Sequence, residues 1–382
     1  MRVSIIFLLF VVHISFVSCV ENQREQADSK KKIIVGYVPG FRGNLEGLSI
    51  DASKLTHINY AFVDVQDSMA WLTNIETDTV NFRILNELKK VNPDLKILIS
   101  VGGWSWSGNF SDATLTPSSR RKFARTSVDI VATYDLDGVD IDWEYPGLIG
   151  DNNVFRPEDK QNYTLMFEEI RKELDELTKQ TGKTYELTTA VGAFYAYIEH
   201  TEMDKASQYL DYVNLMTYDY YTVGDSAGHH SNLYPPEDYN KDASAHKSFT
   251  EFLEAGVPAE KLVMGLPFYG RSWIMKSADK HGINMPVKDR ARGAGYTYIK
   301  DSLVDKKGFV RYWDDNAKAP YLFNSTTNQL MVYDDEESVK LKCEYVIDNG
   351  MGGVMFWQYA SDPKEYLLDA VNEHLYPETD AH

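Results

Sequence analysis

The sequence predicts a (β/α)8 barrel, the TIM-barrel fold, because short apolar segments alternate with helical segments along most of its length. The apolar segments are rich in β-branched residues and have the near-continuous hydrophobicity of parallel strands that are buried on both faces. Polar and charged residues directly follow several of these segments. The active sites of such barrels lie at these C-terminal strand ends. The 382 residues are 43% hydrophobic and 13% aromatic, which is enough to bury one such core.

The first 19 residues predict an export signal. Arg2 precedes an apolar run from Ile5 to Val17 that is too short to span a bilayer and has the composition of a secretory signal peptide. The polar, charged stretch at 20–31 is predicted to be a disordered tether. We therefore expect an exported protein, either secreted or held at a bacterial cell envelope.

Cys19 leaves two interpretations of this leader open. The segment Phe16-Val17-Ser18-Cys19 resembles the lipobox of bacterial lipoproteins, in which the cysteine is lipidated, although Phe16 stands where an aliphatic residue is usual. Ordinary signal cleavage after Cys19 is the alternative. Lipidation is favoured because the chain has one other cysteine, Cys343, whereas a secreted eukaryotic counterpart would normally carry disulfides. Cys343 is expected to be a buried, small apolar residue.

Eight segments are predicted to be barrel strands. In chain order they span residues 32–38, 56–63, 96–101, 138–144, 186–191, 212–218, 262–268 and 352–358. The segments between them show a helical spacing of apolar residues, for example at 163–177 and 244–255. Candidate functional residues fall at or just beyond the predicted strand ends: Glu144, Asp219, Arg271 and Trp357.

One interval interrupts this alternation, between the seventh strand and the helix before the eighth. Residues 272–332 hold many aromatic and turn residues, as at 293–298 and 312–315. The barrel is therefore expected to span 32–378, with the segment 272–332 inserted within it.

The charge of the chain restricts its partners. Its 39 basic and 57 acidic residues give a net charge of −18, which argues against binding to nucleic acid or to anionic membranes and is compatible with a neutral polymer such as a glycan. The nine histidines show no metal-ligand spacing, and His229-His230 is predicted to be a polar loop pair. We expect a monomer that needs neither a metal nor another cofactor.

The most informative segment is 136–146, which carries three acids at alternating positions of a predicted strand. Asp140, Asp142 and Glu144 therefore project from one face, roughly 6–7 Å apart along the backbone. At a separation of about 5 Å and an effective dielectric near 20, each adjacent pair repels by about 3 kcal/mol. At least one of these acids is expected to hold a proton near neutral pH, as general-acid catalysis requires.

Two other interpretations of this segment are a metal site and a solvated acidic strand. A solvated edge would not interleave Val139, Ile141 and Trp143, and a hard-cation site usually takes its ligands from a loop or from several elements. The catalytic interpretation is therefore favoured. Asp137 has the opposite strand parity and is expected to be structural.

The acidic motif Asp137-Gly138-x-Asp140-x-Asp142-x-Glu144 resembles the signature of glycoside hydrolase family 18, the chitinases and their relatives. Further motifs match that family in the same order: Ser100-Val101-Gly102-Gly103-Trp104, Met216-Thr217-Tyr218-Asp219, Leu266-Pro267-Phe268-Tyr269-Gly270-Arg271 and Gly352-Gly353-Val354-Met355-Phe356-Trp357. The similarity runs from about residue 33 to about residue 370. Segment 272–332 resembles an α+β module that forms one wall of a deep groove in a subset of this family.

The resemblance implies a role for each matched acid. Glu144 would protonate the glycosidic oxygen and later activate water, covered by the flanking Trp143 and Tyr145. The substrate's own N-acetyl oxygen would be the nucleophile, giving an oxazolinium ion and net retention. Asp142 would accept the acetamide N–H, and Asp140 would share a proton with it.

The remaining site residues follow from the same resemblance. Tyr218 would hold the attacking acetamide oxygen, Asp219 would contact the distorted sugar, and Trp104 and Trp357 would stack on sugar rings. The other expected substrate-binding residues are Tyr37, Phe62, Ser100, Gly103, Tyr145, Met216 and Arg271, with Tyr37 and Ser100 also hydrogen-bonded to Asp140. For Phe62 and Met216, core packing is an equally good explanation.

Three functions remain open. The first is a chitinase that cleaves β-1,4 bonds between N-acetylglucosamine units, and the α+β module favours it. The second is an endo-β-N-acetylglucosaminidase that acts on N-glycans. The third is a chitin-binding lectin without activity, which would usually have lost the acid or its partner, whereas Glu144, Asp142, Asp140 and Tyr218 are all in place.

Overall fold

The computed structural model describes residues 31–222, 224, 226–237 and 242–376. The chain divides into two units, Met1–Lys32 and Ile33–His382, and the second holds the whole of the fold described below. The predicted signal at 1–19, with Cys19, and nearly all of the predicted tether at 20–31 lie outside the described residues.

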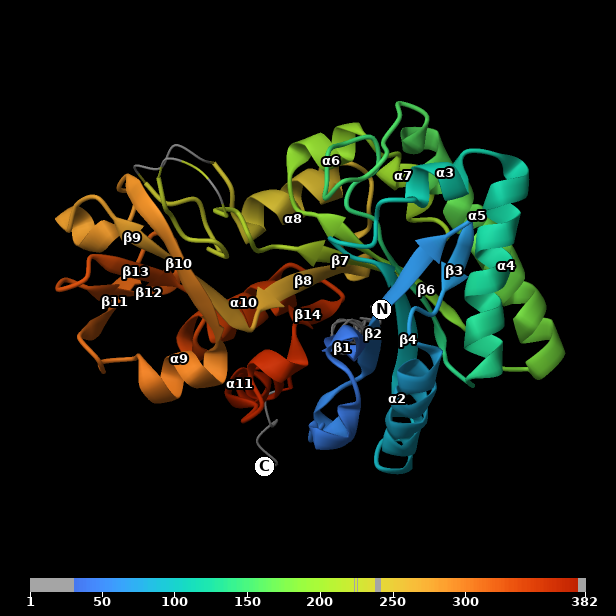
Figure 1. The fold of residues 1–382 in the computed structure, drawn as a ribbon, viewed down its shortest axis with the longest axis horizontal. Coiled ribbons are helices and arrows are strands. Elements are labelled where there is room, and N and C mark those ends of the chain that lie inside the picture. Colours follow the sequence, from blue (N-terminus) through green and yellow to red (C-terminus); the bar gives the residue numbers. More distant parts are fainter. Residues whose placement is uncertain (1–30, 223, 225, 238–241, 377–382) are drawn as a thin grey trace, which may run out of the picture. The chain divides into compact units, whose positions relative to one another are not determined.

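A closed parallel barrel forms the centre of the second unit (Figure 1). Its strands within the described residues are β1 (Ile33–Pro39), β2 (His57–Gln66), β4 (Lys96–Gly102), β5 (Gly138–Asp142), β6 (Glu186–Gly192), β7 (Tyr212–Met216), β8 (Leu262–Pro267) and β14 (Gly353–Trp357). They follow one another around the barrel in chain order, and the pairing of β14 with β1 closes it. Each of the eight predicted segments overlaps one of these strands, which confirms the predicted fold.

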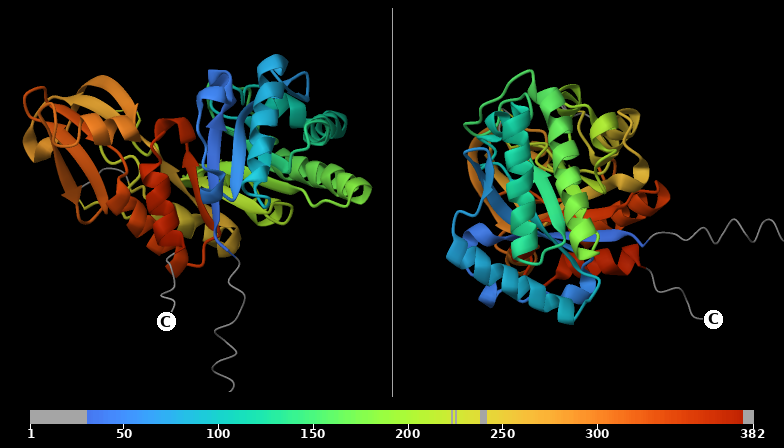
Figure 2. Two further views of the ribbon diagram at one scale, coloured as in Figure 1. Left: turned by 90° about the horizontal axis from the view of Figure 1, so that it is seen from below. Right: turned by 90° about the vertical axis from the view of Figure 1, so that its right-hand side faces the viewer.

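Helices cover the outside of the barrel (Figure 2). They are α2 (Ile75–Glu87), α3 (Phe110–Thr114), α4 (Pro117–Thr133), α5 (Asp159–Thr181), α6 (Tyr195–Glu199), α7 (Met203–Ala206), α8 (Ala245–Glu254), α10 (Glu336–Asp348) and α11 (Tyr366–Leu375). Local signals set their ends. Thr116 and Ser119 form a capping box before α4, with Pro117 at its first position, and Gly182 ends α5 in the left-handed conformation.

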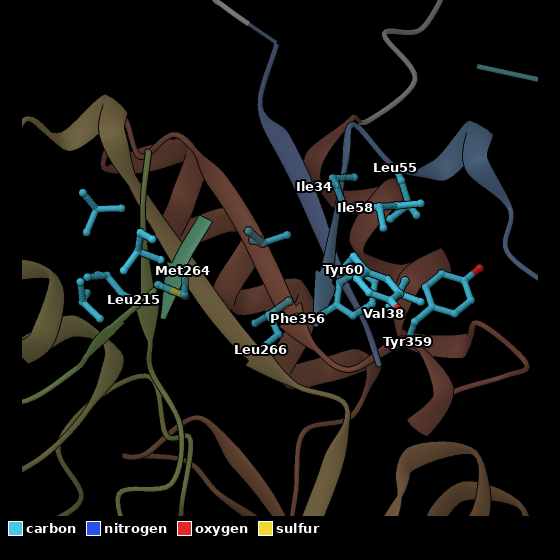
Figure 3. Close-up of a cluster of buried hydrophobic side chains, with 14 of the residues drawn as sticks. Ile34, Val38, Leu55, Ile58, Tyr60, Leu215, Met264, Leu266, Phe356 and Tyr359 are labelled. Carbon is cyan, nitrogen blue, oxygen red and sulfur yellow. The ribbon is translucent and has the colours of Figure 1, made fainter. Parts of the chain in front are cut away.

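The main hydrophobic core lies between the outer faces of the strands and the surrounding helices. Figure 3 shows part of it, with Val38, Tyr60 and Tyr359 close together beside β1 and β2. Strand alternation places Val139, Ile141 and Trp143 in this core, fully buried, so the acids between them point into the barrel. Cys343 of α10 is free and buried there, as predicted, and burial raises the pKa of its thiol to about 12.

A second, antiparallel sheet extends from the end of β8 and is orange in Figure 1. In the described part of the chain it contains β9 (Tyr269–Met275), β10 (Val287–Gly295), β11 (Phe309–Asp314), β12 (Ala319–Asn324) and β13 (Gln329–Val332), in the order β10-β9-β13-β12-β11, with helix α9 (Tyr296–Ser302) between β10 and β11. The barrel therefore carries an inserted α+β subdomain. Its first strand begins at Tyr269, three residues before the predicted segment 272–332, because β9 follows β8 after a single residue, Phe268.

Asp137 lies at the opposite end of the barrel from Glu144, just before β5. Its Oδ2 accepts a hydrogen bond from the Ile97 N–H at 2.8 Å and lies 2.6 Å from Lys89 Nζ. These contacts tie β4 and the short helix η4 (Leu88–Lys90) to the start of β5, so Asp137 has the structural position predicted for it.

Candidate active site

Asp140 lies at the bottom of the candidate site, completely buried on β5. It accepts hydrogen bonds from Tyr37 Oη (2.9 Å) and Ser100 Oγ (2.7 Å), both predicted from the sequence. Thr188 Oγ1 (2.6 Å) and Asn214 Nδ2 (3.3 Å), from β6 and β7, also donate to it and were missed. Burial raises the pKa of Asp140, and these hydrogen bonds oppose that rise.

Asp142 and Glu144 follow Asp140 at alternate residues, so all three side chains point to the same side. Oδ1 of Asp142 is buried and has no hydrogen-bond partner among the described residues. Burial raises the pKa of Asp142 well above its usual range, and the charges of Glu144 and Asp140 raise it further. Burial also raises the pKa of Glu144 to about 7, while a hydrogen bond from Tyr145 opposes this shift and the charge of Asp219 adds to it. A general acid at neutral pH needs such a value.

The backbone around Glu144 is held by the end of β4. Gly102 has φ +109°, and a Cβ there would lie 2.2 Å from the Asp142 carbonyl oxygen, so this close approach requires glycine. The Gly103 N–H donates to the same oxygen at 2.8 Å, and Gly103 lies against the Phe62 ring. The Glu144 N–H donates to Ser107 Oγ at 2.9 Å.

Trp143 does not provide the cover for Glu144 that its neighbouring position suggested. Its ring stacks on Phe110 at 5.1 Å in the core outside the barrel. The strand alternation that directs Glu144 into the site directs Trp143 away from it. Tyr145, by contrast, faces the cleft together with Glu144.

Tyr218 follows β7 with its hydroxyl protonated and weakly bonded. Its Oη lies 3.9 Å from Met355 Sδ, a weak acceptor. Burial raises the pKa of Tyr218 well above its usual range, and the charges of Asp142 and Asp219 raise it further. The phenol is therefore protonated near neutral pH and can donate a hydrogen bond.

Asp219, in the left-handed conformation at φ 62°, is held by a set of donors. Arg271 binds both of its oxygens, through Nε at 2.5 Å and through a second guanidinium nitrogen, and Tyr269 Oη donates to Oδ1 at 2.7 Å. His230 Nδ1 lies 3.3 Å from the same Oδ1. Burial alone would raise the pKa of Asp219, but hydrogen bonds from His230 and Arg271 hold it well below its usual range. Asp219 is therefore a fixed anion.

The sequence predicted His229-His230 to be a polar loop pair, but each of the two side chains also contacts a carboxylate. His229 and His230 do lie in a loop, but both are buried, and His229 Nε2 lies 3.2 Å from Asp314 of the inserted subdomain. The two histidines thus contact different acids, Asp314 and Asp219. In the part of the chain that the structure describes, no group of three or more His, Cys, Asp or Glu side chains is arranged to hold a metal ion.

Aromatic rings form the walls of the site. Phe41, Phe62 and Trp357 are nearly parallel, with centroids 5.4–6.4 Å apart and interplanar angles of 6–18°. Phe41 was missed, although an aromatic residue just beyond the first predicted strand is a sequence signal for a barrel site. Trp104 is 51% exposed and meets Tyr145 edge-on at 6.3 Å. Exposed rings of this kind suit the apolar faces of sugars.

These residues surround one cleft of about 1480 Å³ at the C-terminal ends of the barrel strands. The predicted site residues that line it are Phe62, Trp104, Asp142, Glu144, Tyr145, Met216, Tyr218, Asp219, Arg271 and Trp357. Tyr37, Ser100 and Asp140 lie beneath its floor, where Tyr37 and Ser100 both donate a hydrogen bond to Asp140. The inserted subdomain supplies one wall, through Trp273, Arg290 and their neighbours.

The family model for glycosyl hydrolases family 18 matches residues 33–362. The chain belongs to this family. Chitinase A1 of Niallia circulans is 36% identical over 418 residues, an alignment that covers 92% of this chain and 59% of the relative, so the chain spans less than two thirds of that protein. Chitotriosidase-1 of Mus musculus is 33% identical, with 86% of this chain and 71% of the relative covered.

Solved structures of family 18 proteins agree with this fold. A structure described as a novel glycoside hydrolase family 18 N-acetylglucosaminidase from Paenibacillus barengoltzii matches with a TM-score of 0.84 and 40% identity, covering 90% of this chain and 99% of that one. Chitinase ChiA74 from Bacillus thuringiensis matches with a TM-score of 0.86 and 33% identity, covering 91% and 70%.

The pKa of Glu144 sets the expected pH dependence of any family 18 hydrolysis at this site. The acid must be protonated to act, so kcat/KM should fall by about tenfold per pH unit above pH 7. Initial rates on an aryl chitobioside between pH 4 and 9 would measure this. Rates that stay level up to pH 9 would contradict the assignment of Glu144 as the acid.

Proposed function

We propose that this protein hydrolyses β-1,4-linked polymers of N-acetylglucosamine, namely chitin and chito-oligosaccharides, with retention of anomeric configuration. The observation that carries the proposal is the buried Asp142–Glu144 pair, in which Glu144 has a pKa of about 7 and Asp142 has an unused oxygen. The pair lies in a cleft whose aromatic walls suit sugar rings. The relatives named as chitinases support the same substrate.

The proposed reaction uses the substrate's acetamide group as its nucleophile. The acetamide oxygen attacks the anomeric carbon while Glu144 gives its proton to the departing glycosidic oxygen, so the glycosidic C–O bond breaks and an oxazolinium ion forms. Asp142 accepts the acetamide N–H through its unused oxygen and stabilises the positive charge. Water then adds to the anomeric carbon, Glu144 takes a proton from it, and the ring opens to the retained product.

Tyr218 is proposed to hold the acetamide oxygen in line for this attack. The Tyr218→Phe variant should lower kcat on chito-oligosaccharides by about tenfold, because one hydrogen bond to a developing charge is lost. Its thermal stability should not change, since the hydroxyl bonds only weakly to Met355. Tyr163→Phe is a matched control, as Tyr163 is a buried tyrosine on the outer side of the barrel that bonds Thr189. A kcat equal to that of the unmodified protein would exclude this role.

A product analysis tests the proposed function. Chitohexaose and a high-mannose glycopeptide are digested side by side, and the products are identified by mass spectrometry. Release of short chito-oligosaccharides from the hexamer alone supports the proposal. Cleavage of the glycopeptide alone would instead show a glycan-trimming endo-β-N-acetylglucosaminidase, and binding of chitohexaose without cleavage would show a lectin.

One comparison favours a second candidate function, the removal of single N-acetylglucosamine units from a chain end. The Paenibacillus barengoltzii protein described as an N-acetylglucosaminidase is 40% identical and is covered over 99% of its length. The same digest separates the two functions. An enzyme of this second kind releases the monosaccharide from the first time point, whereas a chitinase with a long cleft releases dimers and trimers.

We further propose that the protein is exported and that Cys19 carries a lipid anchor. No helix among the described residues is long and apolar enough to cross a membrane. Expressed in a bacterium, the unmodified chain should fractionate with the membranes and a Cys19→Ser variant should be soluble. Equal solubility of the two chains would favour simple secretion.

A further inference from the structure

Glu144 lies beyond the part of β5 that strand pairing holds in place. The pairing of β5 with β4 ends where Asp142 lies opposite Gly102, and its pairing with β6 ends where Asp142 lies opposite Ala190. Glu144 follows two residues later, in an irregular segment. Its carboxyl group must nevertheless keep a fixed place beside Asp142, because a displacement of about 1 Å can cost about 10²-fold in rate. The backbone of Glu144 therefore needs a contact other than a strand ladder.

Ser107 supplies that contact. It lies in the turn segment between β4 and α3, and its side chain is fully buried. Its Oγ accepts the Glu144 N–H at 2.9 Å. The same Oγ lies 2.9 Å from the carbonyl oxygen of Gly103 and 3.1 Å from that of Asp142, so its one proton is shared between these two acceptors. The hydroxyl is therefore both a donor and an acceptor at the end of β5.

These hydrogen bonds hold the backbone on both sides of Trp143. The Asp142 carbonyl precedes Trp143 and the Glu144 amide follows it, and Ser107 contacts both groups. The Gly103 N–H also donates to the Asp142 carbonyl at 2.8 Å, and the Trp143 ring is fully buried in the main core. The step from Asp142 to Glu144 is therefore fixed at its start, its middle and its end.

Ser107 contacts the two acids from behind the wall of the cleft. Its neighbours at 104–106 line the cleft, whereas Ser107 itself is fully buried. It can therefore influence a reaction through the backbone of the acids without touching the substrate. Loss of its hydroxyl would leave the buried Glu144 N–H without this acceptor, and the backbone is expected to shift until that N–H finds another partner.

We propose that Ser107 is a positioning residue for hydrolysis, because its hydroxyl sets the separation of the Asp142 and Glu144 carboxyl groups. This inference rests on the proposed function. In the proposed reaction Glu144 protonates the glycosidic oxygen while Asp142 accepts the acetamide N–H. The two carboxyl groups must therefore reach two atoms bonded to the same sugar ring, and a fixed backbone keeps them at the separation that the ring requires.

The test removes the hydroxyl and separates turnover from binding. Ser107→Ala should lower kcat on chitohexaose by about tenfold or more. In the Glu144→Gln background, where hydrolysis is prevented, the same substitution should change the calorimetric Kd of chitohexaose by less than about twofold. Ser107→Cys keeps nearly the same shape but has a weak donor and a weak acceptor, so its kcat should lie between those of the alanine variant and the unsubstituted protein.

The pH dependence gives a readout that a merely structural role would not change. Burial raises the pKa of Glu144 from its ordinary value of 4.5 to about 7. A loosened backbone should leave this carboxyl less buried in Ser107→Ala and lower its pKa, so kcat/KM should begin to fall at a lower pH. Tyr145 and Asp219, which also act on this pKa, are unchanged in the variant. Initial rates on the aryl chitobioside measure the shift.

Ser127→Ala is the matched control, because Ser127 of α4 is also fully buried and its Oγ donates to the Phe123 carbonyl of its own helix at 2.9 Å. Thermal melting of each variant checks folding. A Ser107→Ala protein with the kcat and pH dependence of Ser127→Ala would overturn the positioning role and leave the proposed function intact. An equal loss of kcat and of chitohexaose binding would overturn it too. If the unsubstituted protein neither binds nor cleaves chitohexaose, the proposed function itself is wrong, and this inference with it.

Discussion

Glu144→Gln is expected to reduce hydrolysis of chito-oligosaccharides by about 10³-fold, within the 10²–10⁴-fold range of general acid–base catalysis, while binding stays measurable. Glutamine has nearly the same shape but no proton to give. The substitution therefore removes a carboxyl group whose pKa of about 7 lets it give up a proton at neutral pH. The neighbouring Asp142 and the aromatic walls are unchanged, so the sugar contacts remain.

Turnover of chitohexaose and calorimetric binding of the same oligosaccharide measure the two parts of this prediction separately. Glu260→Gln is the control, because Glu260 is exposed in η5 (Ala259–Lys261), before β8 at the other end of the barrel. A Glu144→Gln protein that hydrolyses chitohexaose at the unmodified rate would remove Glu144 from the reaction.

Lys342→Met is expected to lower the free energy of unfolding by about 3–5 kcal/mol, because it leaves a buried carboxylate without its partner. Lys342 of α10 and Asp334, just before that helix, are both fully buried, with Nζ 2.5 Å from Oδ2. Ser338 Oγ donates to the other carboxylate oxygen at 2.8 Å. Removing the ammonium group breaks this arrangement at a site that water does not reach.

Denaturant titration measures this loss, and two further variants interpret it. Lys340→Met, on the same helix, removes a half-exposed lysine 3.9 Å from Glu344 and should cost less than about 1 kcal/mol. The double variant Lys342→Met/Asp334→Leu should recover much of the stability, since no charge is then left unpaired. If Lys342→Met and Lys340→Met have the same effect, the buried pair does not stabilise the attachment of α10.

The barrel and the row of acids were predictable because both depend on short-range patterns. Continuous β-branched segments locate the strands, and the two-residue repeat of β5 separates the inward Asp140 and Asp142 from the outward Val139 and Ile141. The partners of Asp140 on other strands were harder to predict. Thr188 contacts Asp140 because the two lie opposite each other in the β5–β6 register, and a threonine in a strand carries no mark of that position.

Other features that the sequence did not reveal lie outside the barrel strands or at the boundary between the two sheets. Phe41 lies in the three-residue helix η1 (Gly40–Arg42) and His230 in a loop, so neither belongs to a periodic pattern, and only the position of Phe41 after the first strand hints at its place in the site. The start of the inserted subdomain was placed late for a related reason. The apolar run of β8 continues into β9, and an apolar pattern does not reveal the change from a parallel to an antiparallel sheet.

The position of Arg271 joins two properties of the cleft that are usually treated separately. Arg271 belongs to β9, the first strand of the inserted subdomain, yet its guanidinium neutralises Asp219 of the barrel. A shortened chain without the insertion would lose the ion-pair partner of Asp219 together with one wall of the groove. A change in the insertion would therefore alter both the depth of the groove and the charge balance at Asp219, and it would leave His230, in the loop after β7, as the barrel side's own contact to that carboxylate.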